Sequence, residues 1–297
     1  MSAPGRPASG IPMLLVAACC YGCNIPFARL AAQLGVPGVD LVVLRGSLLC
    51  AIVLSMALVL GRSLAVKPGE RMTMLGLALA CAVIGPAYLS SVAFVPVGIA
   101  VMVFYTYPLF ILALSPFVDG ATVTPARLSV FALAFAGIAL AIGPSSSGLD
   151  WRGLALALLA SFGATAQFFF AARGPGGGGM VALFWVNLTV FPVSLVLSLA
   201  TGGPADLATL AAGWLPVALT TAFFLAGLVL QLRGLRLAGA TAAGLVFCLE
   251  PVVAIAIAAL VLDERLSPLK YAGAGLVLAA IMHNFGFGLR GRQAALP

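Results

Sequence analysis

Ten long apolar stretches occupy most of this chain, and each is about as long as a lipid bilayer is thick. A helix needs ~20 apolar residues to cross a bilayer. Only 8% of the 297 residues are charged and 63% are hydrophobic, whereas soluble domains carry ~25% charged residues. The sequence therefore predicts an all-α integral membrane protein with ten transmembrane helices, and it excludes a water-soluble or disordered chain. The predicted helices are residues 11-33, 38-60, 72-93, 98-118, 126-143, 151-172, 180-200, 209-232, 238-262 and 268-289.

The 15 Lys and Arg residues outnumber the 8 Asp and Glu residues, and their placement says more than the net charge of +7. If the N-terminus is cytoplasmic, ten of the 15 basic residues fall in cytoplasmic segments and five fall in the outer half. Basic residues are enriched on the cytoplasmic side of membrane proteins. The sequence thus predicts that both termini are cytoplasmic. The basic balance is a topology signal, so no nucleic-acid partner is expected.

No motif of this chain is typical of a metal site, a disulfide framework or a nucleotide site. The glycine-rich run 173-179 lacks the Gly-Lys-Ser/Thr ending of a phosphate-binding loop. A membrane-embedded enzyme is not expected either, because the chain has one His and no paired acids within the spans. We therefore expect no metal, no cofactor and no ATP-driven transport. The cysteines all lie in apolar stretches and are interpreted as small buried hydrophobes: Cys19, Cys20, Cys23, Cys50, Cys81 and Cys248.

The chain resembles itself at an offset of 143 residues. Such a repeat predicts two halves of five helices each, residues 1-143 and 144-297. Because five is an odd number, the second half must enter the membrane from the opposite side, which gives an inverted repeat. Two inverted halves can rock about a central site, as alternating access requires. The aligned pairs are Pro108 with Pro251, Thr124 with Ser267, Pro125 with Pro268 and Ile138 with Ile281.

Pro108 and Pro251 each lie inside a predicted span. A proline within a helix removes one backbone hydrogen bond and bends the helix. The carbonyl groups freed in this way are tolerated in lipid only against protein or a wet cavity. The two prolines are candidate hinges that frame a central cavity. The competing interpretation is that each bend serves packing alone.

Ionisable side chains within the spans are few, and each is a candidate for function because an unpaired charge in lipid is costly. Glu250, beside Pro251, could carry a coupling proton or bind a substrate amine, or it could tie helices together. Arg45 lies near enough to the outer end of its span to extend its guanidinium to the interface. His283, near the end of the last span, is interpreted as an interfacial residue.

Polar and aromatic side chains describe a candidate cavity better than charges do. Tyr21 and Asn24 are three residues apart and therefore share one helix face. A site with aromatic walls and a few amide and hydroxyl groups suits an apolar or aromatic ligand with a small polar head. The alternative is that the rings only fill the core or face lipid. The candidate substrate-binding residues are Tyr21, Asn24, Tyr88, Tyr105, Gln167, Trp185 and Glu250.

Several short motifs, taken in order, resemble the EamA-type drug/metabolite transporter superfamily. The resemblance covers both halves and implies ten helices in two inverted halves. It further implies cytoplasmic termini and export of metabolites, often amino acids, across a bacterial inner membrane. In the first half, Tyr107 occupies the position of Glu250 and Gly120 that of Asp263, so a mechanism with a symmetric pair of acids loses support. The motifs are Tyr21-Gly22-Cys23-Asn24, Arg45, Leu249-Glu250-Pro251, Asp263-Glu264-Arg265-Leu266-Ser267-Pro268 and Gly273-Ala274-Gly275.

The charges inside the spans also limit the substrate. An anion such as a sugar phosphate would need several basic residues at mid-membrane, and a cation would need several acids, so a neutral or zwitterionic metabolite fits best. The resemblance, at its finest, implies a YddG-type exporter of aromatic and other amino acids. The alternative is a multidrug exporter of lipophilic cations that is proton-coupled through Glu250. We expect a small-molecule substrate and a lipid bilayer as partners, and a monomer is one expectation.

Overall fold

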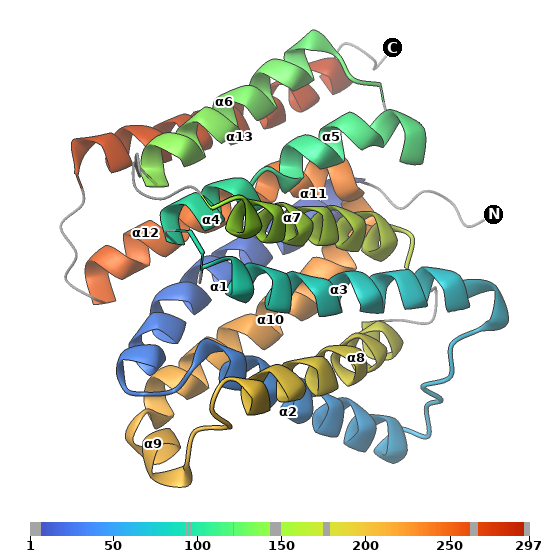
Figure 1. Cartoon of the computed structure of the whole chain (residues 1–297). Helices are drawn as coiled ribbons and strands as arrows, with labels where there is room; N and C mark the ends of the chain where they lie inside the picture. Colours follow the sequence, from blue (N-terminus) through green and yellow to red (C-terminus); the bar gives the residue numbers. More distant parts are fainter. Residues whose placement is uncertain are drawn as a thin grey trace.

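The computed structural model describes residues 7–92, 94–95, 97–120, 122–142, 150–174, 179–261 and 267–293, and every regular element within these ranges is a helix (Figure 1). The Asp263-Glu264-Arg265-Leu266 motif and the boundary between the predicted halves, at residue 143, lie outside the described residues. Most of the predicted spans coincide with helices of the expected length. Six of them are single helices: α1 (Pro7–Gln33), α2 (Gly38–Val59), α3 (Arg71–Ser91), α7 (Trp151–Ala172), α8 (Gly179–Ala200) and α10 (Trp214–Ala238).

Within the described residues, eight helical segments are long and apolar enough to cross a membrane. They are the six single helices and two segments that are each interrupted near the middle. The fifth predicted span corresponds to a shorter apolar helix. The tenth corresponds to a helix whose backbone is described throughout, whereas its side chains are described only as far as His283. These two are α6 (Pro125–Ile142) and α13 (Pro268–Gln293). The chain is thus a multi-pass membrane protein, and the count of ten stays a prediction.

The two interrupted segments correct the sequence prediction of bent but continuous helices over 98-118 and 238-262. The first consists of α4 (Val97–Phe104) and α5 (Tyr107–Val118), and the second of α11 (Ala240–Phe247) and α12 (Leu249–Val261). Pro108 and Pro251 lie in the first turns of α5 and α12. A proline costs little there, because backbone N–H groups in the first turn have no partner within the helix. The prolines therefore begin half-helices instead of bending whole ones.

Residues with side-chain oxygens begin several other helices. Thr124 accepts a hydrogen bond from the backbone N–H of Arg127 at 3.3 Å, at the start of α6. Asp150 accepts one from the backbone N–H of Arg152 at 2.8 Å, at the start of α7. Such caps pair amide groups that a helix leaves free at its N-terminus. Two short helices lie between the long ones: the 3-10 helix η1 (Pro68–Glu70) and α9 (Leu207–Ala212).

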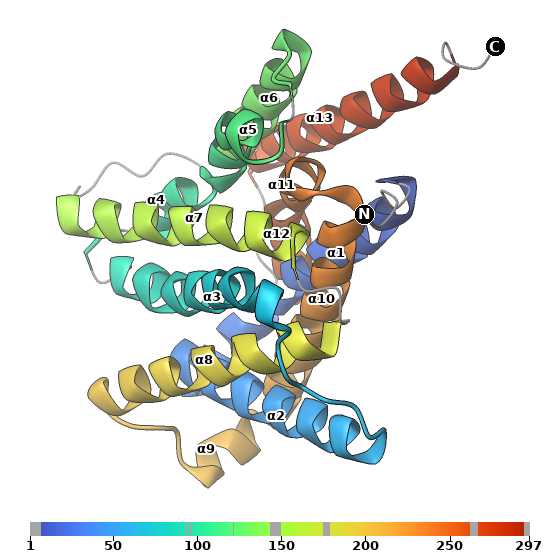
Figure 2. The same cartoon turned by 90° about the vertical axis from the view of Figure 1, so that its right-hand side faces the viewer.

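The long helices pack in pairs that join one element from each predicted half of the chain. α1 runs along α10, α3 along α7, α2 along α8, and α6 along α13 (Figures 1 and 2). The half-helices α4, α5, α11 and α12 lie between the α6–α13 pair and the remaining helices. The breaks in the two interrupted segments are thereby enclosed by protein, as backbone irregularities inside a membrane must be.

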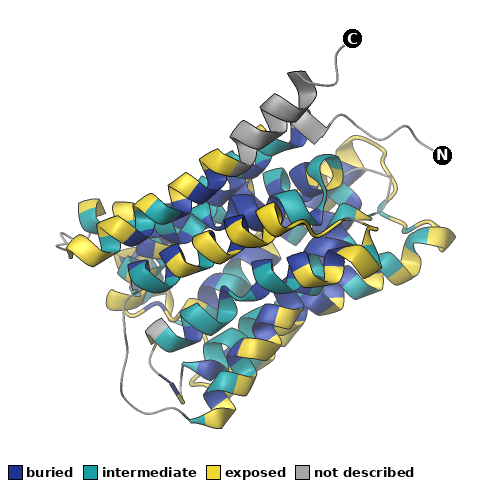
Figure 3. Cartoon of the chain, turned by 90° about the horizontal axis from the view of Figure 1, so that it is seen from above, coloured by how far each residue is buried: buried dark blue, intermediate teal, exposed yellow. Residues whose placement is uncertain are grey.

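Burial follows the expectation for a protein surrounded by lipid. Buried residues face the centre of the bundle, whereas exposed residues follow the outward faces of the helices (Figure 3). Many of the exposed residues are large and apolar, among them Leu58, Val59, Phe117 and Leu199. An apolar outer surface of this kind would be costly in water and is favourable against lipid tails.

Candidate functional site

A cavity of about 230 Å³ lies at the centre of the bundle. Its walls come from α1, α2, α3, α7, α8 and α10, together with residues beside the two helix breaks. Most of the lining is apolar or aromatic, including Phe104, Phe168, Phe224 and Phe247. The remaining side chains supply hydroxyl, thiol, amide and carboxylate groups: Tyr21, Cys81, Tyr107, Gln167, Asn187, Gln231 and Glu250.

Tyr21 is fixed in the wall by three contacts. Its hydroxyl donates a hydrogen bond of 2.9 Å to Oε1 of Gln231 on α10. Its ring meets Phe224 edge-on, with centroids 5.7 Å apart, and lies tilted against Phe247 at 5.9 Å. Aromatic pairs in such geometries add stability beyond their buried area. Tyr21 therefore joins α1, α10 and α11 at the cavity, and its role in substrate binding stays a prediction.

Glu250 brings the only carboxylate to the wall among the described residues that line the cavity. It lies in the first turn of α12, close to the side chain of Tyr105, which lies in the break between α4 and α5. The two helix breaks thus meet through these two side chains. Tyr105 itself is buried.

An aromatic cluster supports this contact from behind. Phe104 touches the rings of Tyr88, Tyr105 and Tyr107 with centroids 5.4 to 5.5 Å apart. Tyr107 in turn packs on Phe168 at 5.2 Å. Tyr88 therefore belongs to a layer behind the cavity wall and does not line the cavity.

Arg45 corrects the expectation that its guanidinium reaches the membrane interface. Only 6% of this residue is exposed. Its Nη2 donates hydrogen bonds to Oδ1 of Asn24 at 2.8 Å and to Oγ1 of Thr220 at 2.6 Å. Its guanidinium also lies over the ring of Phe224, 4.8 Å from the centroid. Residues of α1 and α10 enclose the Arg45 side chain of α2, so its guanidinium is buried inside the bundle and does not extend to the interface. The amide oxygen of Asn24 holds the guanidinium in place.

Gln167 and Asn187 supply amide groups to opposite parts of the lining. Gln167 on α7 lies close to the thiol of Cys81 on α3, which also lines the cavity. Asn187 on α8 is buried, and its Nδ2 donates a hydrogen bond of 2.8 Å to the carbonyl of Leu183. Sequence reasoning identified Gln167 and missed Asn187. The signal for Asn187, an amide within an apolar span, is the same one that pointed to Gln167.

Trp185 lies away from the cavity. It is 37% exposed, and its Nε1 donates a hydrogen bond of 2.8 Å to the carbonyl of Leu64, in the connection between α2 and α3. The predicted residues thus separate into three groups. Tyr21, Gln167 and Glu250 line the cavity; Tyr88 and Tyr105 pack against residues of its wall, and Asn24 hydrogen-bonds Arg45 behind it; Trp185 anchors a connecting segment.

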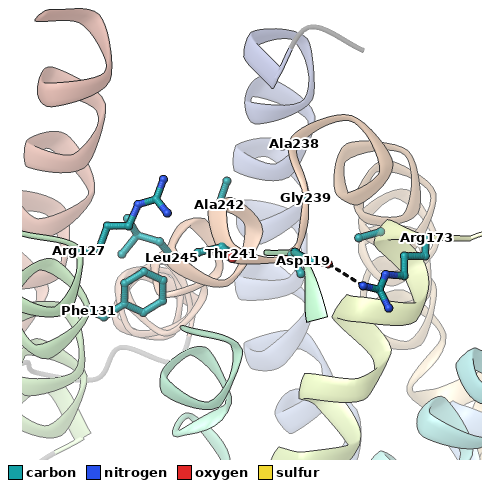
Figure 4. Close-up of a pocket in the computed structure, with 11 residues that line it drawn as sticks. Asp119, Arg127, Phe131, Arg173, Ala238, Gly239, Thr241, Ala242 and Leu245 are labelled. Carbon is teal, nitrogen blue, oxygen red and sulfur yellow. Dashed lines mark hydrogen bonds and ion pairs between the residues drawn. The ribbon is translucent and has the colours of Figure 1, made fainter. Parts of the chain in front are cut away.

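A second cavity, of about 400 Å³, lies at the helix ends that the charge bias assigns to the cytoplasm. Arg127 and Phe131 line it on α6, and the turn around Gly239 lines it between α10 and α11 (Figure 4). Across it, Nη2 of Arg173 forms an ion pair with Oδ1 of Asp119 at 3.3 Å (Figure 4). Partial burial raises the pKa of Asp119 above its ordinary value, and the nearby guanidinium of Arg173 opposes this shift.

The contact between α5 and α11 separates the two cavities. Tyr107 and Phe247 line the central cavity, whereas Leu245 lines the second one. Between them, a Cβ atom on Gly244 would stand 3.1 Å from Cδ1 of Ile111. The two half-helices are therefore closely packed between the two cavities, and we call this contact of Gly244 with Ile111 the seal.

Comparison with known proteins agrees with this architecture. The model of the EamA-like transporter family matches the chain over residues 8–143 and again over residues 151–285. A protein of Synechocystis sp. named "Uncharacterized transporter sll1319" is 27% identical over 199 residues, which are 64% of this chain and 59% of that protein, so the match spans less than two thirds of the relative. A solved crystal structure has the same fold, with a TM-score of 0.71 at 18% identity over 93% of this chain and 96% of that chain. On the strength of the family match, this chain belongs to the EamA-like transporter family.

Proposed function

We propose that this protein exports small neutral or zwitterionic metabolites, most readily amino acids including aromatic ones, through the central cavity. The observation that carries the proposal is the composition of the cavity wall. Six of its eighteen residues are aromatic, most of the others are aliphatic or glycine, and a few amide and hydroxyl groups and the carboxylate of Glu250 interrupt this apolar surface. A wall of this kind binds an apolar or aromatic side chain and orients its polar head.

The size of the cavity favours a small ligand. Its volume of about 230 Å³ is below the ~300–1,000 Å³ of sites that enclose drug-sized molecules. A single carboxylate on the wall matches a single ammonium group. An anion with several charges would have to shed its hydration shell without basic partners on the wall, which is costly.

We propose alternating access as the mechanism, with residues 1-143 and 144-297 as inverted halves. The pairing of the helices supports it. Exchange of the halves would turn the α1–α10 pair into the α7–α3 pair, and it would leave the α2–α8 and α6–α13 pairs unchanged. The seal of Ile111 on Gly244 between the two cavities is the kind of contact that must open when the site faces the other side.

The proposed setting is a bacterial inner membrane with both termini in the cytoplasm and a monomer as the transporting unit. The excess of Lys and Arg on one side of the spans supports this orientation. Movement of the substrate down its own gradient is the simplest scheme, because the wall offers one titratable carboxylate and no symmetric partner for it.

A second candidate function is a proton-coupled multidrug exporter. The position of Glu250 favours it, because this carboxylate lies on the wall where a lipophilic cation or a proton could bind. Such an exporter would need Glu250 to exchange a proton during each cycle. The amino-acid proposal needs only a hydrogen bond or ion pair from this residue.

Counterflow in proteoliposomes separates the two functions. The purified protein is reconstituted, and exchange of labelled phenylalanine, threonine and a quaternary-ammonium drug is measured with and without an imposed pH gradient. We expect exchange of the amino acids that does not depend on the gradient. Exchange of the drug alone would contradict the proposal and establish the second candidate, and gradient-driven amino-acid flux would assign Glu250 as a proton carrier.

A further inference from the structure

Among the described residues, no carboxylate neutralises Arg45, a cation enclosed within the helix bundle. In the part of the chain that the structure describes, its partners are the Asn24 amide oxygen, the Thr220 hydroxyl and the Phe224 ring. Its Nε is buried and has no hydrogen-bond partner there. A buried charge without an opposite charge is costly. The positive charge of Arg45 is therefore available to an anionic group brought by a ligand.

The guanidinium lies directly behind the wall of the central cavity. Phe224, whose ring the guanidinium covers, lines the cavity. Val42, three residues before Arg45 on α2, also lines it. Residues three apart share a helix face. The Phe224 ring therefore belongs both to the cavity wall and to the surroundings of the guanidinium, and a ring screens a charge far less than water does.

The negatively charged group, the Glu250 carboxylate, lies on another part of the wall of the same cavity. Tyr21 contacts the ring of Phe224, over which the Arg45 guanidinium lies, and also the ring of Phe247, which precedes the helix break at Cys248 and lies near Glu250 in the sequence. A row of three rings thus connects the positive region to the region of the carboxylate. A zwitterion could place its ammonium at Glu250 and its carboxylate toward the Phe224 wall, with its side chain on the rings.

We propose that Arg45 determines specificity for a substrate carboxylate and orients the substrate from behind the Phe224 ring. This inference rests on the proposed function and deepens it, because it requires an amino acid and not merely an apolar ligand. Arg45 acts here as a positioning residue through its field, without contact with the substrate. Complementary charge of this kind provides selectivity between related ligands.

The competing role for Arg45 is purely structural, because its hydrogen bonds tie α1, α2 and α10 together. The two roles differ in what they predict for different substrates. A lost structural tie slows every substrate by the same factor. Loss of the electrostatic attraction from Arg45 slows only the substrate that carries a carboxylate. The informative measurement is therefore the ratio of the transport rate of an amino acid to that of its amide.

The experiment compares counterflow of phenylalanine and phenylalaninamide by the full-length protein and by Arg45→Gln and Arg45→Lys. We expect Arg45→Gln to lower the phenylalanine-to-amide ratio about tenfold and Arg45→Lys to retain most of the preference. The matched control is Arg233→Gln, an exposed arginine near the other end of α10, which should leave the ratio unchanged. An equal loss for both substrates in Arg45→Gln would overturn the inference and leave Arg45 a structural role.

A second variant keeps the inference testable if Arg45→Gln does not fold. Phe224→Leu retains the charge and removes the ring in front of it, so we expect the phenylalanine-to-amide ratio to rise. A ratio that falls or stays constant would contradict the inference. Failure of the proposed function looks different: the unmodified protein would then exchange neither phenylalanine nor threonine, and this inference would fall with it.

Discussion

Gly22 on α1 lies against the backbone of Glu250 on α12. A Cβ atom on Gly22 would stand 2.7 Å from the Glu250 carbonyl oxygen and 2.6 Å from Cβ of Val253. Real side chains do not approach so closely, so only glycine permits this crossing. The crossing positions the first turn of α12, and with it the carboxylate on the cavity wall.

Replacement of Gly22 by Ala should therefore displace α12. We expect destabilisation of about 1–3 kcal/mol, as for overpacked cores, and loss of most transport because Glu250 moves relative to Tyr105. Thermal unfolding in detergent and counterflow measure the two effects. Gly275→Ala is the matched control, because a Cβ atom at Gly275 meets no atom within 4 Å. Equal behaviour of the two variants would disprove the close crossing.

The hydrogen bond between Tyr21 and Gln231 gives a second prediction. Tyr21→Phe keeps the ring contacts with Phe224 and Phe247 but leaves Oε1 of Gln231 without its donor. Hydrogen bonds between membrane helices contribute roughly 0.6 kcal/mol on average and up to about 1.7 kcal/mol. We expect a stability loss in this range, measured by a double-mutant cycle with Gln231→Leu. Additive effects in the cycle would show that the bond contributes nothing.

The seal between the cavities predicts a change in accessibility. Gly244→Leu places extra atoms against Ile111 and should force α5 and α11 apart. In a variant that retains Cys248 as its only cysteine, we expect a small thiol reagent added from the cytoplasmic side to react faster with this otherwise buried residue. Gly275→Leu in the same background serves as the control. Unchanged labelling of Cys248 would mean that the contact seals nothing.

Asp119 provides a pH dependence at the second cavity. Burial raises the pKa of this carboxyl in the folded state, so the ionised form is less favourable there than in the unfolded chain. The sign follows from linkage. Below the ordinary pKa the carboxyl is protonated in both the folded and the unfolded state, so it does not affect the free energy of unfolding; the destabilisation of the folded state grows as the pH rises from the ordinary pKa through the raised pKa. We expect Asp119→Asn to unfold at a slightly higher temperature than the native protein at pH 7 and at the same temperature near pH 3. The effect is small because both partners of the ion pair reach water. A lower unfolding temperature at pH 7 would show that attraction to Arg173 outweighs burial.

The sequence predicted the spans well because the length of an apolar run reports directly on the thickness of the bilayer. It could not predict the helix breaks at Thr106 and Cys248, because a proline fits both a bent helix and the first turn of a new one. The two outcomes differ only in the surrounding packing. Thr165 on α7, for example, donates a hydrogen bond of 3.4 Å to the Tyr107 carbonyl beside the break.

The candidate site was predictable where polarity alone marked a residue. Tyr21, Gln167 and Glu250 are polar groups deep in apolar spans, and all three line the cavity. Arg45 and Trp185 misled sequence reasoning because their surroundings depend on neighbouring helices. The position of Arg45 near a span end suggested access to water, yet α1 and α10 enclose it, and Trp185 turns outward to the Leu64 carbonyl.

Gly85 permits the most direct test of the claim that substrate passes through the central cavity. It lines the cavity, and a Cβ atom there meets no atom within 4 Å, so Gly85→Leu should fold normally and fill the space where substrate binds. Gly275→Leu makes the same chemical change on α13, at a position that is equally open and does not line the cavity. The measurement is counterflow of labelled phenylalanine by both variants after equal incorporation and equal thermal stability are established. We expect Gly85→Leu to abolish exchange while Gly275→Leu retains it; exchange by Gly85→Leu at the rate of the native protein would show that substrate does not pass through the central cavity.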